Sequence, residues 1–165
     1  MLYLLDANVL ITASRTYYGI ERVPEFWDWL AHMGKTNNIK IPQEVYEEFK
    51  DGNDALAAWA KQDDIESVLL LNEPVNIELV RHVTKNGYAS DLTDDELEKL
   101  GRDPFLIAYG LKDAGNRTVV TTEVSKPKRI RANRHMPDVC VGLKIPCCNT
   151  FDLTTALNFR TGWNR

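Results

Sequence analysis

Cysteine, long hydrophobic runs and excess positive charge are all scarce in this chain of 165 residues. The three cysteines, Cys140, Cys147 and Cys148, are odd in number and lack C-x-x-C spacing. They predict free thiols in a reducing cytoplasm, not a disulfide framework or a zinc site. The longest apolar runs, such as SVLLL at 67–71, are too short to span a bilayer, and the N-terminus shows no signal-peptide pattern. We therefore expect a cytoplasmic protein with no membrane partner.

The formal net charge of −4 gives no general attraction to nucleic acid, but the charges are unevenly placed. Five of the 20 basic residues lie in SKPKRIRANRH, which we call the basic loop (Ser125–His135). Such a cluster favours phosphate binding, although an exposed loop explains any single Lys or Arg equally well. In the acidic stretch SDLTDDELEKL, Thr93 and Glu96 predict a capping box at a helix start, with no chemical role.

Short apolar runs alternate with helical patterns along the chain. Strands are expected at 2–5, 38–41, 117–122 and 144–148, and helices are expected to begin near 24, 42, 54, 73, 93, 103, 137 and 151. The stretch IESVLLL at 65–71 is compatible with a strand or a buried helix. Strands separated by helices predict a three-layer α/β/α fold with a mostly parallel sheet, and the chain length predicts one domain over 1–165.

Acidic residues recur at comparable places in this alternation. Asp6 follows the first strand, Glu123 follows TVVTT, and Asp103 begins a helix. Ligands of open α/β sheets collect outside the carboxyl ends of the strands, so a parallel sheet would bring at least Asp6 and Glu123 to one rim. Each residue alone has a simpler explanation: Asp6 and Asp103 as caps, and Glu123 as a solvated loop residue.

The fourth acid comes from the helix QEVYEEFK. Val45 and Phe49 mark its buried stripe, and Glu47 lies about 160° from that stripe, so Glu47 should face water. Glu44 and Glu48 flank the stripe four residues apart, where two like charges oppose helix formation unless something compensates them. We choose Glu48 and keep Glu44 as a neighbour, although a charged helix flank also explains Glu48 on its own.

A cluster of three or four carboxylates does not stay fully ionised unaided. Either some pKa values rise, or a divalent cation neutralises the set. Oxygen ligands with no nearby histidine or cysteine favour Mg²⁺ or Mn²⁺ over zinc, and such sites most often handle phosphates. The three histidines have no spacing that indicates a base or a ligand.

Four stretches resemble, in order, the acidic motifs of PIN-domain nucleases, of which the VapC-type toxins are familiar members. They are YLLDANVLI, IPQEVYEEFKDG, RDPFLIAYGL and TVVTTE. In the second motif the family's acid precedes an apolar residue and, three positions further on, a glycine; here these are Phe49 and Gly52, which again selects Glu48. The resemblance is to a divergent branch, because residues 53–101 look like extra helical material and Glu123 stands where the family usually has Asp.

The resemblance implies an Mg²⁺- or Mn²⁺-dependent endoribonuclease that hydrolyses phosphodiester bonds of single-stranded RNA with a metal-activated water. Asp6 and Asp103 would bind the metal directly, Glu48 and Glu123 would complete the anionic site, and Asn8 and Thr121 would orient the carboxylates or bound waters. It also implies a toxin–antitoxin pair with a cognate antitoxin, and it is compatible with a homodimer. The residues expected to bind RNA are Lys126, Lys128, Arg129 and Arg131 of the basic loop, and Arg15.

Two alternatives remain open from the sequence. A phosphatase of the haloacid-dehalogenase type also has an Asp after its first strand, but it needs a second Asp where this chain has Asn8. A phosphoaspartyl intermediate at Asp6 would favour that class. The other alternative is a non-catalytic PIN-like module that binds RNA or protein through the basic loop, for which the change at Glu123 leaves room.

Overall fold

Four parallel strands form the centre of the molecule in a computed structural model that describes residues 1–165. They are β1 (Leu2–Leu5), β2 (Ile39–Lys40), β3 (Arg117–Val120) and β4 (Cys147–Cys148), in the spatial order β2-β1-β3-β4. Leu4 lies beside Lys40 on one side and Val119 on the other. All four predicted strands are present, and every pairing is parallel, as expected for strands joined by helical crossovers.

Helices occupy most of the remaining chain. They are α1 (Ala7–Arg15), α2 (Pro24–Lys35), α3 (Gln43–Lys50), α4 (Ala55–Ala60), α5 (Asp63–Leu69), α6 (Ile77–His82), the π-helix η1 (Val83–Tyr88), α7 (Asp94–Leu100), α8 (Asp103–Leu111), the 3₁₀-helix η2 (Arg131–Asn133), α9 (Met136–Gly142) and α10 (Thr150–Ala156). The predicted capping box of Thr93 and Glu96 is present at the start of α7. No helix combines the length and apolar character that crossing a membrane requires.

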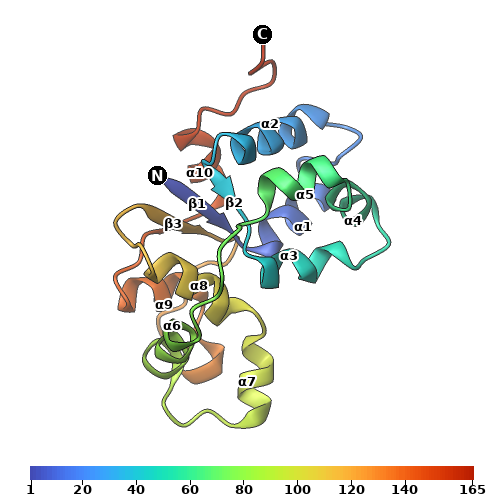
Figure 1. Cartoon of the computed structure of the whole chain (residues 1–165). Helices are drawn as coiled ribbons and strands as arrows, with labels where there is room; N and C mark the ends of the chain where they lie inside the picture. The colour runs from blue at the N-terminus through green and yellow to red at the C-terminus, as the bar shows by residue number, and fades with distance from the viewer.

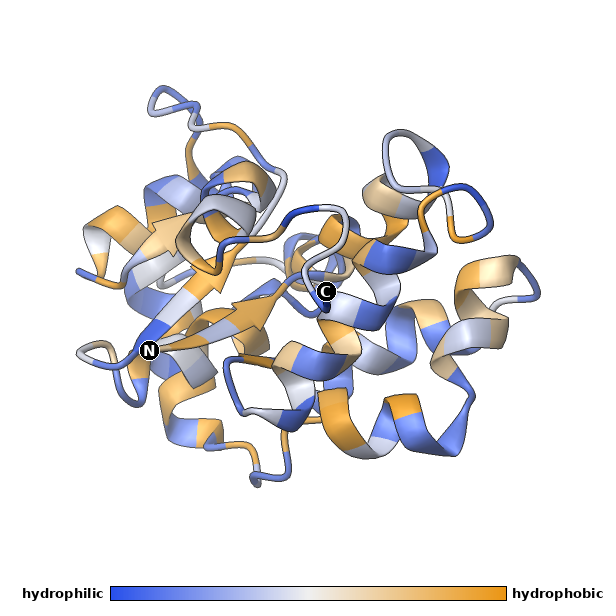
Figure 2. Cartoon of the chain, turned by 90° about the horizontal axis from the view of Figure 1, so that it is seen from above, coloured by the Kyte–Doolittle hydropathy of each residue, from blue (hydrophilic) through white to orange (hydrophobic).

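The sheet lies between two helical layers, with α2 and α10 on one side and α8 and α9 on the other (Figure 1). Coverage of both faces explains why the strands are continuous apolar runs instead of alternating ones, since Leu4 and Leu5 point to opposite faces and are both fully buried. Figure 2 shows this apolar character along the strands. The three-layer α/β/α prediction is confirmed.

Aromatic side chains fill the layer around α2. Phe26 and Trp29 are buried, and Tyr18 stacks on Phe26 with a ring-centroid distance of 4.1 Å. Tyr17 meets Tyr18 edge to face at 5.0 Å, so both tyrosines contribute to packing. The three cysteines are free thiols, as predicted.

Residues 53–101 form a helical excursion between β2 and β3. The ambiguous stretch at 65–71 is mainly helical, because α5 runs to Leu69, and it then adds one strand-like bridge. The Ile41 N–H donates to the Leu69 carbonyl at 2.8 Å, and the Leu71 N–H donates to the Ile41 carbonyl at 2.9 Å. A buried apolar run supports either structure, and here the chain uses both in succession.

The chain reverses direction across the sheet between its two central strands. From β1 it moves outward to β2, and it later returns past β1 to β3 and β4. A crevice at such a switch point lies outside the carboxyl ends of the two central strands. Asp6 follows β1 there, and Thr121 and Glu123 follow β3.

Candidate functional site

Asp6 serves both as a helix cap and as a wall of the crevice. It is the N-cap of α1, where one carboxylate oxygen, Oδ1, accepts the Asn8 N–H at 3.4 Å. The other oxygen, Oδ2, accepts the Thr121 hydroxyl at 2.8 Å. Only 4% of Asp6 is exposed, and burial raises the pKa of its carboxyl although these hydrogen bonds oppose the rise. Thr121 therefore orients Asp6 as expected, whereas Asn8 contributes chiefly its backbone N–H.

Asp103 is not the N-cap of α8. The cap is Arg102, which makes no side-chain capping bond, and Asp103 occupies the first helical position. Its carboxyl is largely desolvated, and this burial, followed by the charges of Asp6, Glu123 and Glu48, raises its pKa to about 8. The simple capping explanation is therefore wrong for this residue. Because the charges of Asp6, Glu123 and Glu48 all raise this pKa, the carboxylates of four separate segments come within electrostatic range at Asp103.

We call these four residues the carboxylate cluster: Asp6, Glu48, Asp103 and Glu123. Glu48 is an exposed residue of α3, yet partial desolvation and then Asp6 raise the pKa of its carboxyl, while Arg102 lowers it. Glu44 is not among the charges that shift the pKa of Asp6, Glu48 or Asp103; it acts on Tyr109, whose pKa burial and then Glu44 raise to about 12. Glu47 is exposed, as expected. The choice of Glu48 agrees with this placement.

Glu123 ties the end of β3 to the start of α9. Its backbone N–H donates to the Thr121 hydroxyl oxygen at 3.1 Å, and its Oε2 accepts the Met136 N–H at 2.6 Å. The Nδ1 atom of His135 lies 4.0 Å from the same oxygen. The expectation that no histidine lies near the acids is therefore wrong for His135. A hydrogen bond with Cys140 lowers the pKa of the Cys147 thiol, while burial and the nearby charges of Asp6 and Glu123 oppose this shift.

The side chains as they stand do not form a closed ligand set, since no three or more His, Cys, Asp or Glu groups converge closely enough to hold a metal ion. Asp6 and Glu123 are instead turned toward protein donors, namely the Thr121 hydroxyl and the Met136 N–H. The donor chemistry nevertheless fits a hard divalent cation, because the acids supply oxygen atoms and their mutual repulsion is what a cation relieves. Side-chain rotation would have to complete the set.

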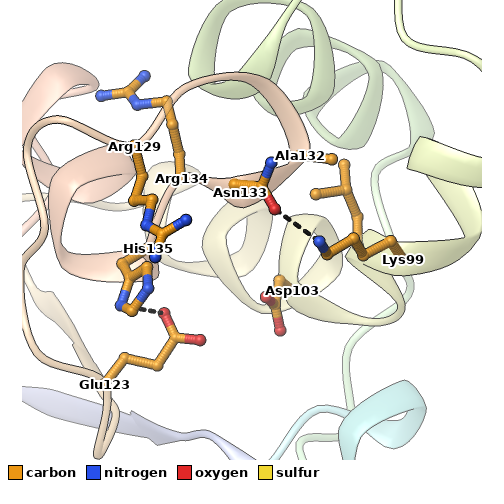
Figure 3. A pocket seen from close by; sticks show the side chains of 9 residues that line it. Lys99, Asp103, Glu123, Arg129, Ala132, Asn133, Arg134 and His135 are labelled. Atoms are coloured by element: carbon orange, nitrogen blue, oxygen red, sulfur yellow. Dashed lines mark hydrogen bonds and ion pairs between the residues drawn. The ribbon is translucent and has the colours of Figure 1, made fainter.

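A pocket of about 340 Å³ opens beside Asp103 and Glu123 (Figure 3). It is bordered by the end of α7, the start of α8 and the second half of the basic loop. Its lining is Lys99, Leu100, Asp103, Glu123, Arg129, Ala132, Asn133, Arg134 and His135. Positive side chains therefore surround an opening whose wall is part of the carboxylate cluster, an arrangement that suits a phosphate group.

The structure separates the basic residues predicted to bind RNA. Arg129 lines the pocket, whereas Lys126 and Lys128 are exposed outside its lining. Arg131 is bound by two acids, with its nitrogens 2.8 Å from Glu96 and 2.7 Å from Asp91. This ion-pair network fastens the basic loop to α7, so the guanidinium is not free for phosphate, in contrast to our expectation.

Arg15, which the sequence also predicts to bind RNA, lies at the opposite end of α1 from Asp6. It ends α1, whose first residue follows Asp6, and a nine-residue helix spans about 13 Å. Its guanidinium lies 3.8 Å from Asp54, and both side chains are exposed. Arg15 therefore lies away from the carboxylate cluster, and its predicted contact with RNA at this site is not supported by its position.

Two residues near the carboxylate cluster, Lys99 and Tyr88, are not predicted from the sequence. Lys99 lies in the acidic stretch, for which the sequence predicts no chemical role, yet its Nζ donates to Asn133 Oδ1 at 2.5 Å across 34 positions of sequence. Tyr88, in the π-helix, is 7% exposed, and its hydroxyl has no hydrogen-bond partner. Burial and then the charges of Asp103 and Glu123 raise the pKa of this hydroxyl. No local sequence pattern marks these residues. The π-helix that carries Tyr88 is visible only in the structure, and π-helical turns are frequent at functional sites.

A family model described as "Domain of unknown function (DUF4411)" matches residues 3–161. The chain belongs to the DUF4411 family. The match includes all four members of the carboxylate cluster and the whole basic loop, so in this DUF4411 chain the site and the sheet that carries it lie within one family region. No curated protein matches the chain, and no solved structure matches it.

Proposed function

We propose that this chain is a metal-dependent endoribonuclease of the PIN type that hydrolyses phosphodiester bonds in single-stranded RNA. The observation that carries the proposal is the meeting of four carboxylates at the switch point of the sheet, where burial and then the charges of the other three acids raise the pKa of Asp103 to about 8. Perturbed acids in a crevice are candidates for catalysis. Positive groups beside Asp103 and Glu123 support a phosphate substrate.

Asp6 and Asp103 would hold the divalent cation directly, with Glu48 and Glu123 completing the anionic set. A bound Mg²⁺ or Mn²⁺ supplies Lewis-acid polarisation of a phosphoryl oxygen and lowers the pKa of water. Thr121 fixes the direction of Asp6, and Met136 fixes that of Glu123. The proximity of His135 favours including Mn²⁺ among the ions tested, because imidazole suits transition metals better than it suits Mg²⁺.

The biological setting we propose comes from the resemblance to VapC-type toxins. The chain would act in the cytoplasm as the toxin of a toxin–antitoxin pair, with RNA as its substrate and an antitoxin as its protein partner, alone or as a homodimer. Growth arrest on induced expression, relieved by co-expression of the neighbouring gene, is the expected behaviour.

A second candidate is a non-catalytic module that binds RNA. The hydrogen bonding of Glu123 favours this candidate, because the carboxylate already accepts the Met136 N–H at 2.6 Å. In that case RNA affinity would persist without cleavage, and divalent ions would not alter the RNA.

The test is cleavage of a mixed RNA pool with Mg²⁺ or Mn²⁺, against a chelator and the Asp6→Asn variant. Asparagine also caps helices well, so this variant should fold while losing one charge of the cluster. We expect cleavage by the wild type to disappear with chelator and in Asp6→Asn. The matched control, Asp28→Asn, alters an exposed acid of α2 and should cut normally.

Unchanged cleavage by purified Asp6→Asn would remove the nuclease proposal. Absence of cleavage by the wild type in both ions, combined with retained RNA binding, would favour the binding module instead. Metal binding offers a readout without turnover: calorimetric titration with Mn²⁺ should show weaker binding to Asp6→Asn than to Asp28→Asn.

A further inference from the structure

The pocket beside the carboxylate cluster contains two positive side chains that no acid neutralises. Lys99 donates only to the Asn133 amide oxygen, and neither Lys99 nor Arg129 takes part in an ion pair. The other arginines of the basic loop are engaged: Arg131 binds two acids, and Arg134 donates to backbone carbonyls. Lys99 and Arg129 are therefore the cations available to a ligand in this pocket.

His135 lines the pocket and also lies beside Glu123 of the carboxylate cluster. Its Nδ1 is buried and has no hydrogen-bond partner, although it lies 4.0 Å from Glu123 Oε2. Buried polar atoms in folded proteins are nearly always paired with protein, water or ligand. Because this nitrogen has no exposed surface and faces Glu123, the case for a ligand in the pocket depends on Lys99 and Arg129.

The size and position of the pocket restrict what it holds. Its volume of about 340 Å³ lies at the lower end of the usual range for ligand pockets, about 300–1,000 Å³. This suits one nucleotide and is too small for a duplex. Because Asp103 and Glu123 belong both to the pocket and to the carboxylate cluster, a nucleotide bound here lies directly beside a phosphate held at the cluster.

We propose that this pocket binds the nucleotide next to the bond that is cleaved, with Lys99 and Arg129 contacting its phosphodiester group. The subsite joins α7 to the basic loop, so the helical excursion of residues 53–101 supplies part of the substrate-binding surface. A strand must be unpaired to place one nucleotide there. The nature of the ligand rests on the proposed function, but the subsite itself is testable without cleavage.

The experiment measures the affinity of the full chain for a fluorescein-labelled oligouridylate by anisotropy, in EDTA and over a range of salt concentrations. Lys99→Gln and Arg129→Gln each remove one charge from an exposed side chain. We expect each to weaken binding about tenfold, as for loss of one charge-assisted contact, and to reduce the salt slope by about 0.7. Lys61→Gln, at an exposed lysine following α4, is the matched control and should bind as the wild type does.

A duplex of the same oligouridylate with oligoadenylate tests the unpaired strand. We expect weaker binding of the duplex, with no effect of Lys99→Gln on it. Wild-type affinity and salt slope in both pocket variants would overturn the subsite, and an equal effect of Lys99→Gln on duplex binding would overturn the requirement for an unpaired strand. Loss of binding in these variants, together with no cleavage by the wild type in Mn²⁺, would uphold the subsite while rejecting the nuclease.

Discussion

The acidic helix α7 and the carboxylate cluster differ in what surrounds their acids. Glu96 of α7 accepts hydrogen bonds from the guanidinium of Arg131 at 2.8 Å and from the Thr93 N–H at 2.9 Å, and these contacts lower its pKa to about 2. Asp103 has no comparable donor, and burial together with three neighbouring acids raises its pKa to about 8. The same functional group is thus held charged in one place and driven toward its neutral form in the other.

The difference shows where the fold supplies a counter-charge to its own acids. Arg131 crosses from the basic loop to neutralise Glu96 of α7. In the carboxylate cluster, no positive group lowers the pKa of Asp6 or Asp103, and Arg102 lowers only that of Glu48 among these three acids. Stability alone would favour neutral residues in place of the repelling acids. Local conflicts of this kind are typical of functional sites, where a ligand supplies what the chain lacks.

The largest effect should come from removing the charge of Asp103. Asp103→Asn should stabilise the metal-free protein at pH 7 by up to about 4 kcal/mol, because the buried acid must otherwise take up a proton or remain charged beside three others. For a chain of this size that is a rise of about 10 °C in melting temperature. Thermal unfolding in EDTA measures it, with Asp28→Asn as the control that should not change.

The pH dependence gives the sign of the same effect. The pKa of Asp103 is 3.8 as an ordinary acid and about 8 in the fold, so the folded state binds this proton more tightly. The wild type should therefore be most stable, with respect to this group, below about pH 4, and should lose that stability as the pH rises to 8. Asp103→Asn should remove this slope. Parallel curves for the two proteins would mean that Asp103 is solvated.

A divalent cation should make the carboxylate cluster resemble α7, because it would supply the counter-charge that the cluster lacks. At one hundred times its dissociation constant, Mn²⁺ should stabilise the wild type by about 2.7 kcal/mol, since it binds the folded cluster and not the unfolded chain. The gain should shrink in Asp103→Asn and persist in Asp28→Asn. Equal melting shifts in all three proteins would indicate that the ion binds elsewhere.

The sheet and the helix order were predictable because they depend on local patterns. Continuous apolar runs between helical stretches specify buried parallel strands, and Thr93 with Glu96 specifies a helix start. The environment of Asp103 was harder to predict, because a shift of one residue in the helix boundary, from Asp103 to Arg102 as the cap, decides between a capping side chain and a buried one.

The pocket could not be predicted because its residues meet only through tertiary packing. Lys99 and Asn133 are 34 positions apart, and Arg131 and Asp91 are 40 apart. Composition identifies a basic loop, but it does not say which cations already have acidic partners. Composition therefore predicts an RNA contact for Arg131, although the fold uses this residue to hold α7, and it gives no indication of Lys99 within an acidic helix.

Tyr88 extends the comparison to an uncharged group, since its buried hydroxyl also lacks a partner beside Asp103 and Glu123. Tyr88→Phe should stabilise the metal-free protein by about 1 kcal/mol, because an unpaired buried hydroxyl is removed without loss of the ring. Chemical unfolding in EDTA tests this, and a matched Tyr3→Phe variant changes a tyrosine of β1. Destabilisation by Tyr88→Phe would show that the hydroxyl is satisfied, for example by an internal water.

The smallest effect on stability should come from Glu96, the acid that already has Arg131 as its partner. Glu96→Gln should lower the melting temperature slightly at pH 7, because the contacts with Arg131 weaken, whereas Glu98→Gln changes an exposed acid without an ion pair and should have no effect. Since the pKa of Glu96 is lowered from 4.5 to about 2, its contribution is present above about pH 4.5 and disappears as the pH falls through 2. Its slope is therefore opposite in sign to that of Asp103. High salt should reduce the difference between Glu96→Gln and the wild type while leaving the larger Asp103→Asn difference mostly intact, because exposed pairs are screened more than buried charges.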